Sequence, residues 1–270
     1  MIRVVAIDWS GRGGPDQKRT IWLAEARGDE LLRLENGRTR REIVARLVSE
    51  AQRDPRMIVG FDFAFSVPEW YLHERGLSPR DLWALLDAES LTPAMKRLGL
   101  AAWMNAPEPP FWTTGENHAL LAPDQKCRRT ENDVRGLGSQ PKSVFQLVGA
   151  GQVGRGSLYG MQALHHLAAA GFRIWPFDPP GFPLAVEIFP LAVEIFPRLL
   201  TGPVRKSDPA ARRQYVEALS VDLVAASSED AFDAAISALA MARAVDELCD
   251  LPDEPEYRLE GKIWHRALAA

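Results

Sequence analysis

Four acidic side chains stand in or beside apolar segments of this chain, where a charge is costly unless it has a partner. Asp8 ends the apolar run IRVVAID, and Asp62 lies in a second run, MIVGFDF. Asp230 and Asp233 open the segment DAFDAAISALAMA near the end of the chain. A cluster of carboxylate oxygens without His or Cys is the ligand set that Mg²⁺ or Mn²⁺ prefers, so these residues predict a hard-cation site.

The spacing of these carboxylates indicates what the cations would do. If the runs that hold Asp8 and Asp62 are adjacent parallel strands, their carboxylates face each other across roughly 5 Å. Asp230 and Asp233 are three residues apart in the sequence, so they lie on one face of a helix. Two cations about 3.5–4 Å apart in such a cluster would clamp a phosphodiester for attack by water. We therefore predict a metal-dependent phosphodiester hydrolase whose partner is a nucleic acid or a small phosphoester.

A further carboxylate comes from the segment FPLAVEIFPLAVEIFPRLL, in which FPLAVEI is written twice. The two copies supply Glu187 and Glu194. One strand over 182–197 would span about 53 Å, longer than usual strands, and Pro190 would interrupt its ladder. One copy must therefore be the strand. Because the RLL after the second copy starts a helix, we predict that Glu194 joins the metal site as a catalytic residue, with Glu187 as the alternative.

Basic residues outnumber acidic ones in the segment 126–142. Such a local excess of positive charge can hold phosphates, and we predict Arg128, Arg129 and Lys142 as substrate-binding residues. A solvated loop without a ligand explains the same pattern. The whole chain has a net charge of −4, so any site for a polyanion must be local or made by bound metal.

The elements that position these residues follow from the hydrophobic pattern. Thr39 and Glu42 form a capping box at the start of an amphipathic helix over 40–52. Gly28-Asp29 is a turn signal that joins two strands in a hairpin. The strands on either side of this hairpin and helix are natural parallel neighbours through a right-handed crossover. The predicted strands are 2–8, 20–28, 30–37 and 57–63.

Residues 66–156 break this pattern. They are rich in Pro and Trp, and we predict that they form an insertion with one helix at 79–88. We predict one α/β domain over 1–270, with a mixed sheet flanked by helices and this large inserted region. The later predicted elements are a helix at 157–171, a strand at 172–178, a helix capped by Ser207 or Asp208, and a helix at 228–246.

Several pieces of the sequence resemble a known superfamily. AIDWSG, VGFDFAFS, VEIFPR and DAFDAAISALA resemble the RNase H-like superfamily. Together with RTEND, PKSVFQLVGAGQVG and WPFD, they more closely resemble domain of unknown function 429, a bacterial and archaeal group of predicted nucleases. The final Asp-x-x-Asp-Ala is similar to the last motif of Holliday-junction resolvases. The resemblance implies metal-dependent phosphodiester cleavage by Asp8, Asp62, the strand glutamate and Asp233, with Asp230 beside it; the doubled FPLAVEI departs from the family's pattern.

A glycine loop supports a different function. Its spacing, Gly149-x-Gly151-x-x-Gly154, is that of a dinucleotide fingerprint, and an apolar run ending at Asp178 follows at close to the ribose-binding distance. Gly156 weakens this interpretation, because it loosens the helix start that would hold pyrophosphate. The alternatives are an NAD(P)-binding oxidoreductase, an ATP-handling protein in which AIDWSG is a phosphate loop, and a non-catalytic binding protein with the RNase H fold.

Signals of secretion or membrane insertion are not found in the sequence. The opening MIRVVAIDWS lacks the long apolar core of a signal peptide, and no apolar run approaches the length of a membrane span. The two cysteines, Cys127 and Cys249, match no zinc spacing. We expect a cytoplasmic protein with no membrane partner.

Overall fold

The chain forms an α/β structure with two compact units. The structure is a computed structural model that describes residues 2–88, 110–113, 121–137, 139–147, 153–178, 190–202 and 204–265. The first unit comprises Met1–Asp62, Ala170–Asp253 and Ile263–Ala270, and the second comprises Phe63–Ala169 and Glu254–Lys262. The second unit overlaps the predicted insertion and extends beyond it at both ends. No helix in the described ranges is long and apolar enough to span a membrane.

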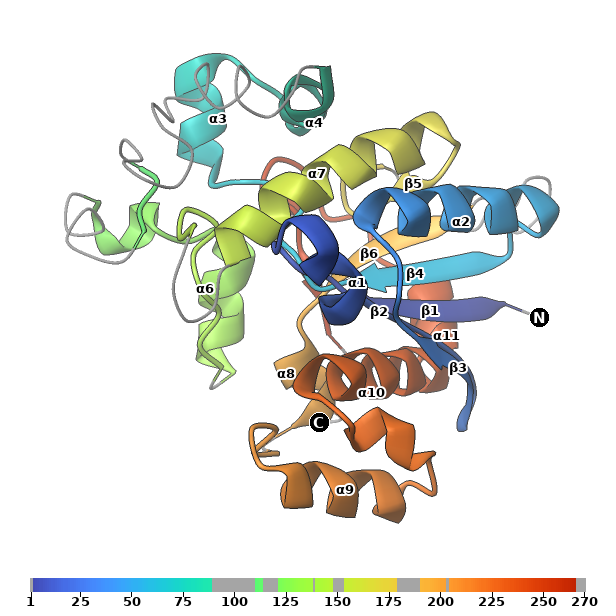
Figure 1. Ribbon diagram of the computed structural model, residues 1–270. Helices are drawn as coiled ribbons and strands as arrows, with labels where there is room; N and C mark the ends of the chain where they lie inside the picture. Colours follow the sequence, from blue (N-terminus) through green and yellow to red (C-terminus); the bar gives the residue numbers. More distant parts are fainter. Residues whose placement is uncertain are drawn as a thin grey trace. The chain divides into compact units, whose positions relative to one another are not determined.

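The first unit is built on a mixed sheet that has seven strands among the described residues (Figure 1). The order is β3-β2-β1-β4-β6-β5, and β7 also pairs with β6. The hairpin of β2 and β3 and the pair β1–β2 are antiparallel, whereas β4, β5, β6 and β7 pair in parallel. The bounds are β1 Arg3–Asp8, β2 Trp22–Arg27, β3 Glu30–Glu35, β4 Met57–Phe61, β5 Arg173–Ile174, β6 Leu191–Ile195 and β7 Ile263–Trp264.

Two helices cover opposite faces of this sheet: α2 (Arg40–Arg53) and α10 (Glu229–Arg243) (Figure 1). Small residues let α10 lie close to the strands, and most of its alanines are buried. Gly60 in β4 lies closely against this helix, because a Cβ there would lie 2.5 Å from Met241 Sδ. The other helices of this unit are α1 (Gln17–Thr20), α8 (Pro197–Thr201), α9 (Pro209–Ala218) and α11 (Val245–Cys249).

The second unit is mainly helical in its described parts. Its longest helix, α7 (Val153–Ala169), packs against α4 (Pro79–Ala88). The side chain of Gln162 in α7 donates a hydrogen bond to the carbonyl of Leu86 in α4. Glu260 ties two helix starts together, because its carboxylate accepts the backbone N–H groups of Glu69 (2.7 Å) and Arg129 (2.5 Å). The helices of this unit are α3 (Glu69–Arg75), α4 (Pro79–Ala88), α6 (Arg129–Gly136) and α7 (Val153–Ala169).

The local predictions for the first unit are largely confirmed. The capping box is present, with Thr39 N donating to Glu42 Oε2 at 2.7 Å and Glu42 N donating to Thr39 Oγ1 at 3.3 Å. The strands β1 and β4 are parallel neighbours, as predicted. The strand predicted at 172–178 is shorter, because the Asp178 carboxylate accepts the Ile174 N–H at 2.7 Å and closes a turn.

A network of charges lies on the face of the sheet that α2 covers. Glu50 of α2 accepts hydrogen bonds from Arg3 (2.7 Å), Arg33 (3.1 Å) and Arg46 (2.7 Å). Burial would raise the pKa of Glu50, but the three guanidinium groups outweigh it and lower this pKa to about 2. The ordinary value is 4.5, so the carboxylate stabilises the folded state only while it is ionised.

We expect Glu50→Gln to lower the free energy of unfolding by about 1–2 kcal/mol at pH 7, since the pairs are partly exposed. The folded-state pKa of Glu50 is lowered, so the folded protein binds fewer protons than the unfolded chain. The contribution is fully present above pH 4.5 and is lost as the pH falls toward about 2. Urea unfolding at a series of pH values should show that the free energies of unfolding of the wild type and of Glu50→Gln become equal over this range. Glu30→Gln, at an exposed position, is the control; a constant difference at all pH values would contradict the account.

Candidate carboxylate site

Three aspartates are brought to one end of the sheet by three different elements. Asp8 is the last residue of β1, and Asp62 follows the last residue of β4. Side chains alternate along a strand, and Val4 and Ala6 pack in the core that contains α10. Asp8 therefore lies on the α10 face. The third, Asp233, lies near the start of α10, which Ser228 caps by accepting the Ala231 N–H at 2.9 Å.

The three carboxylates are close enough to disfavour one another's charge. Burial first, and then the charges of Asp62, Asp233 and Asp230, raise the pKa of Asp8 well above its usual value. Burial and Asp233 likewise raise the pKa of Asp62. Burial also raises the pKa of Asp233, with a further contribution from Asp230. The site thus concentrates negative charge that a cation would relieve.

Asp62 is held in place by the backbone. The Trp9 N–H donates to Asp62 Oδ1 at 2.6 Å, which partly offsets the rise in the pKa of Asp62. The Trp9 ring packs edge-on against Phe61, with ring centroids 5.8 Å apart. The backbone that follows Asp8 therefore fixes the orientation of the Asp62 carboxylate.

A lysine that the sequence analysis did not identify also belongs to the site. Lys206, in the segment between α8 and α9, forms an ion pair with Asp233 Oδ2. Burial alone would lower the pKa of Lys206, but Asp233, Asp8 and Asp62 outweigh burial and raise it. The only sequence signal was a basic residue just before the cap of α9. The two residues of this ion pair are 27 positions apart in the chain, so hydrophobic periodicity cannot predict their contact.

The donor set fits a hard divalent cation in chemistry, although the present arrangement is not that of a metal site. Among the described residues, no group of three or more His, Cys, Asp and Glu side chains is positioned to hold a metal ion. Two observations are consistent with a cation site whose carboxylates do not yet converge on one point. Asp233 Oδ1 is buried without a hydrogen-bond partner, and the ammonium of Lys206 lies against the other oxygen of the same carboxylate. Oxygen donors without His or Cys suit Mg²⁺ or Mn²⁺.

The prediction for the repeated segment is confirmed for the strand and contradicted for its glutamate. The second copy forms β6, as predicted. Within it, Val193 and Ile195 face the core that contains α10, so Glu194 points to the opposite face and is in register with Phe61. The alternation of strand side chains thus separates Glu194 from Asp8. Glu187 lies outside the described residues.

We expect Glu194→Gln to leave Mn²⁺ affinity within about twofold of the wild-type value, because Glu194 lies on the other face of the sheet from Asp8. The side chain is buried, with 2% exposure, so the substitution should act on stability instead. Calorimetric Mn²⁺ titration and urea unfolding of the same variant separate the two effects. Loss of Mn²⁺ binding with unchanged stability would show instead that Glu194 is a ligand of the metal site.

The predicted phosphate-binding residues lie in the second unit and have different environments. Arg128 is almost completely buried, and its guanidinium pairs with Glu131 at 2.9 Å and donates to the Glu260 carbonyl at 2.9 Å. This burial contradicts the predicted phosphate contact for Arg128. The side chains of Arg129 and Lys142 are exposed, as a phosphate-binding role requires.

The described segments on either side of the glycine loop lack the preceding strand of a dinucleotide site. Gly149 and Gly151 lie outside the described residues. The described segment before the loop contains no sheet strand and forms only an isolated bridge between Gln146 and Trp112. Gly154 lies inside α7, where a Cβ would meet the Val144 carbonyl oxygen at 2.2 Å. Close backbone packing explains this glycine without a nucleotide.

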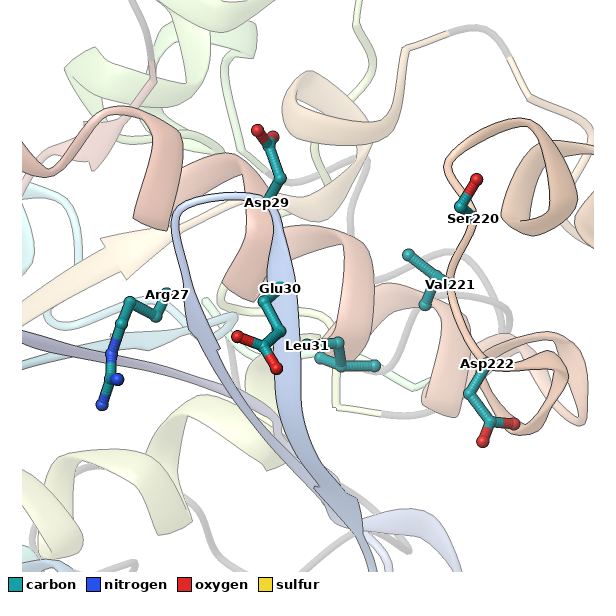
Figure 2. Close-up of a pocket in the computed structure, with 7 residues that line it drawn as sticks. All are labelled: Arg27, Asp29, Glu30, Leu31, Ser220, Val221 and Asp222. Atoms are coloured by element: carbon teal, nitrogen blue, oxygen red, sulfur yellow. The ribbon is translucent and has the colours of Figure 1, made fainter.

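A surface pocket of about 390 Å³ lies at the other end of the β2–β3 hairpin from Asp8 (Figure 2). Its carboxylates do not converge on one point in Figure 2, and Asp29 is paired with Arg243 at 2.6 Å. We assign it no ligand. The pocket is lined by Arg27, Asp29, Glu30, Leu31, Ser220, Val221 and Asp222.

Comparisons with known proteins identified no relative of this chain. No family model, curated protein or solved structure matches the chain. The resemblance to domain of unknown function 429 therefore rests on the sequence motifs alone and stays a prediction.

Proposed function

We propose that the protein is a divalent-metal-dependent phosphodiester hydrolase with a fold of the RNase H type. The observation that carries the proposal is the gathering of Asp8, Asp62 and Asp233 at one end of a mixed sheet, under the start of α10. Hard carboxylate oxygens at such a place are suited to Mg²⁺ or Mn²⁺. The strand order, with an antiparallel β1–β2–β3 meander and β4 parallel to β1, supports the RNase H assignment.

The residues of the site would have different roles. Asp8, Asp62 and Asp233 would hold the cation, and Asp230 adds negative charge beside them. A divalent cation bound there would supply Lewis-acid stabilisation of charge on a phosphodiester. The Trp9 N–H fixes the orientation of Asp62, so this carboxylate does not have to be ordered when a ligand arrives. Asp8 and Asp62 retain some solvent exposure, which gives a cation and a substrate access.

The test is a cleavage assay on the full chain. Bis(p-nitrophenyl) phosphate, single-stranded DNA, single-stranded RNA and branched DNA duplexes are incubated with the metal-free protein and with Mg²⁺ or Mn²⁺. We expect metal-dependent cleavage of at least one substrate, and Asp233→Asn should abolish it. Cleavage that persists in excess chelator, or metal-dependent cleavage that survives in the Asp233→Asn variant, would contradict the proposal.

A non-catalytic binding protein with the same fold is the second candidate. It is favoured by the contact of Lys206 with Asp233, which gives this carboxylate a partner without any metal. In that case the assay should show no cleavage of any substrate, and Mn²⁺ should not change the thermal unfolding of the protein. The NAD(P)-binding alternative gains no support from the described part of the glycine loop.

A further inference from the structure

We propose that Lys206 is an internal cation of the carboxylate site, which holds the place of a divalent ion beside Asp233 and is displaced when that ion binds. This inference rests on the proposed function, because it concerns the same site. It assigns a positioning role to a residue that no sequence motif identified.

The ammonium of Lys206 lies where a cation would be needed. It contacts Asp233 Oδ2, and it also acts electrostatically on Asp8 and Asp62. The second oxygen of Asp233 is buried and has no hydrogen-bond partner. A cation that draws all three carboxylates together must therefore share Asp233 with Lys206 or move the ammonium away. Two positive charges within contact distance of one carboxylate repel each other strongly in a partly buried site.

The backbone of Lys206 is anchored, whereas its side chain is long and about two-fifths exposed. The Lys206 carbonyl accepts a hydrogen bond from the buried guanidinium of Arg212. Arg212 also donates to the Ala226 carbonyl at 3.1 Å, and the Lys206 N–H donates to Val204 at 3.0 Å. The chain is thus fixed close to the site, and rotation of the lysine side chain can carry the ammonium toward solvent without moving the fold.

This arrangement makes a specific prediction about affinity. In the wild-type protein the free energy of Mn²⁺ binding includes the loss of the Lys206–Asp233 contact. If Lys206 is replaced by Met, the stem is kept and the competing charge is removed, so Mn²⁺ should bind more tightly. A charge-retaining replacement, Lys206→Arg, should not have this effect. A lysine with only a structural role would lower stability when replaced and leave Mn²⁺ affinity unchanged.

The experiment is a calorimetric Mn²⁺ titration of the full, metal-stripped chain at pH 7. We expect Lys206→Met to bind Mn²⁺ on the order of ten- to a hundredfold more tightly than the wild type. Lys206→Arg and Lys18→Met should stay within about threefold of it. Lys18 is the matched control, because its ammonium forms a loose pair with Glu42 at 3.9 Å, on another element. Lys206→Gln keeps a hydrogen-bond donor for Asp233 and replaces Lys206→Met if that variant does not fold.

Each outcome decides between the two proposals. Tighter Mn²⁺ binding in the uncharged variants alone supports the inference, and a larger Mn²⁺-induced rise in their melting temperature should accompany it. Equal affinity in wild type and Lys206→Met overturns the inference but leaves the proposed function in place. Weaker binding in Lys206→Met also overturns it, because the lysine would then support the ion. Absence of Mn²⁺ binding in every folded variant overturns the inference and the proposed function together.

Discussion

Asp8→Asn should abolish metal-dependent cleavage, with a loss of at least about a thousandfold in rate, while the protein remains folded. The amide keeps the shape of the carboxylate but removes the negative charge that a hard cation requires. Asp8 is one of three mutually repelling carboxylates, so the metal-free variant should be at least as stable as the wild type. Cleavage rate with saturating Mn²⁺ and thermal unfolding in chelator measure the two effects on the same preparation.

The control for this variant is Asp29→Asn. Asp29 is an exposed residue of the β2–β3 turn, remote along the hairpin from Asp8, and its carboxylate pairs with Arg243. The Asp29→Asn substitution changes the net charge by the same amount as Asp8→Asn. It therefore separates an effect of charge at the carboxylate site from an effect of the protein's net charge. Wild-type cleavage by Asp8→Asn, or an equal loss in Asp29→Asn, would contradict the assignment of Asp8.

Arg128→Met should destabilise the second unit by about 3–5 kcal/mol, since it removes the guanidinium that neutralises a buried carboxylate. The exposed fractions of the Arg128 and Glu131 side chains are 1% and 2%. The guanidinium also donates to the Glu260 carbonyl, so the substitution also breaks a link between the start of α6 and the segment that holds Glu260. Urea unfolding of the full chain, followed by tryptophan fluorescence, should show an earlier transition.

Two further variants separate charge from packing at this position. Arg129→Met should change stability little, because the Arg129 side chain is exposed and its contact with Glu260 uses the backbone N–H. The double variant Arg128→Met with Glu131→Leu should recover part of the loss, since neither charge then stays alone. A folded Arg128→Met protein of unchanged stability that has lost phosphate binding would show that the sequence-based role of Arg128 was correct.

The features that the sequence predicts well are those that local interactions decide. The capping box of Thr39 and Glu42 needs only residues three positions apart. The pairing of β1 with β4 follows from two apolar runs separated by a hairpin and a helix, because the handedness of the crossover leaves few other arrangements. The choice of the second FPLAVEI copy as β6 depended on the adjacent helix start, which is also local.

The features that the sequence does not predict depend on register and on distant contacts. A shift of one residue reverses the face to which every strand side chain points, and no local signal fixed the register of β6 beside β4. Glu194 was therefore assigned to the wrong face. Arg128 looked like part of a solvated basic loop, but its burial involves Glu260, 132 positions away. Lys206 reaches Asp233 in the same way, through a contact that spacing does not encode.

A crystal grown with Mn²⁺ and measured for anomalous scattering would locate the bound cation. We expect an anomalous peak between Asp8, Asp62 and Asp233, with metal–oxygen distances of about 2.0–2.3 Å. The ammonium of Lys206 should then no longer contact Asp233. A protein saturated with Mn²⁺ that shows no peak at these carboxylates, and keeps Lys206 on Asp233, would contradict the carboxylate site and the function proposed from it.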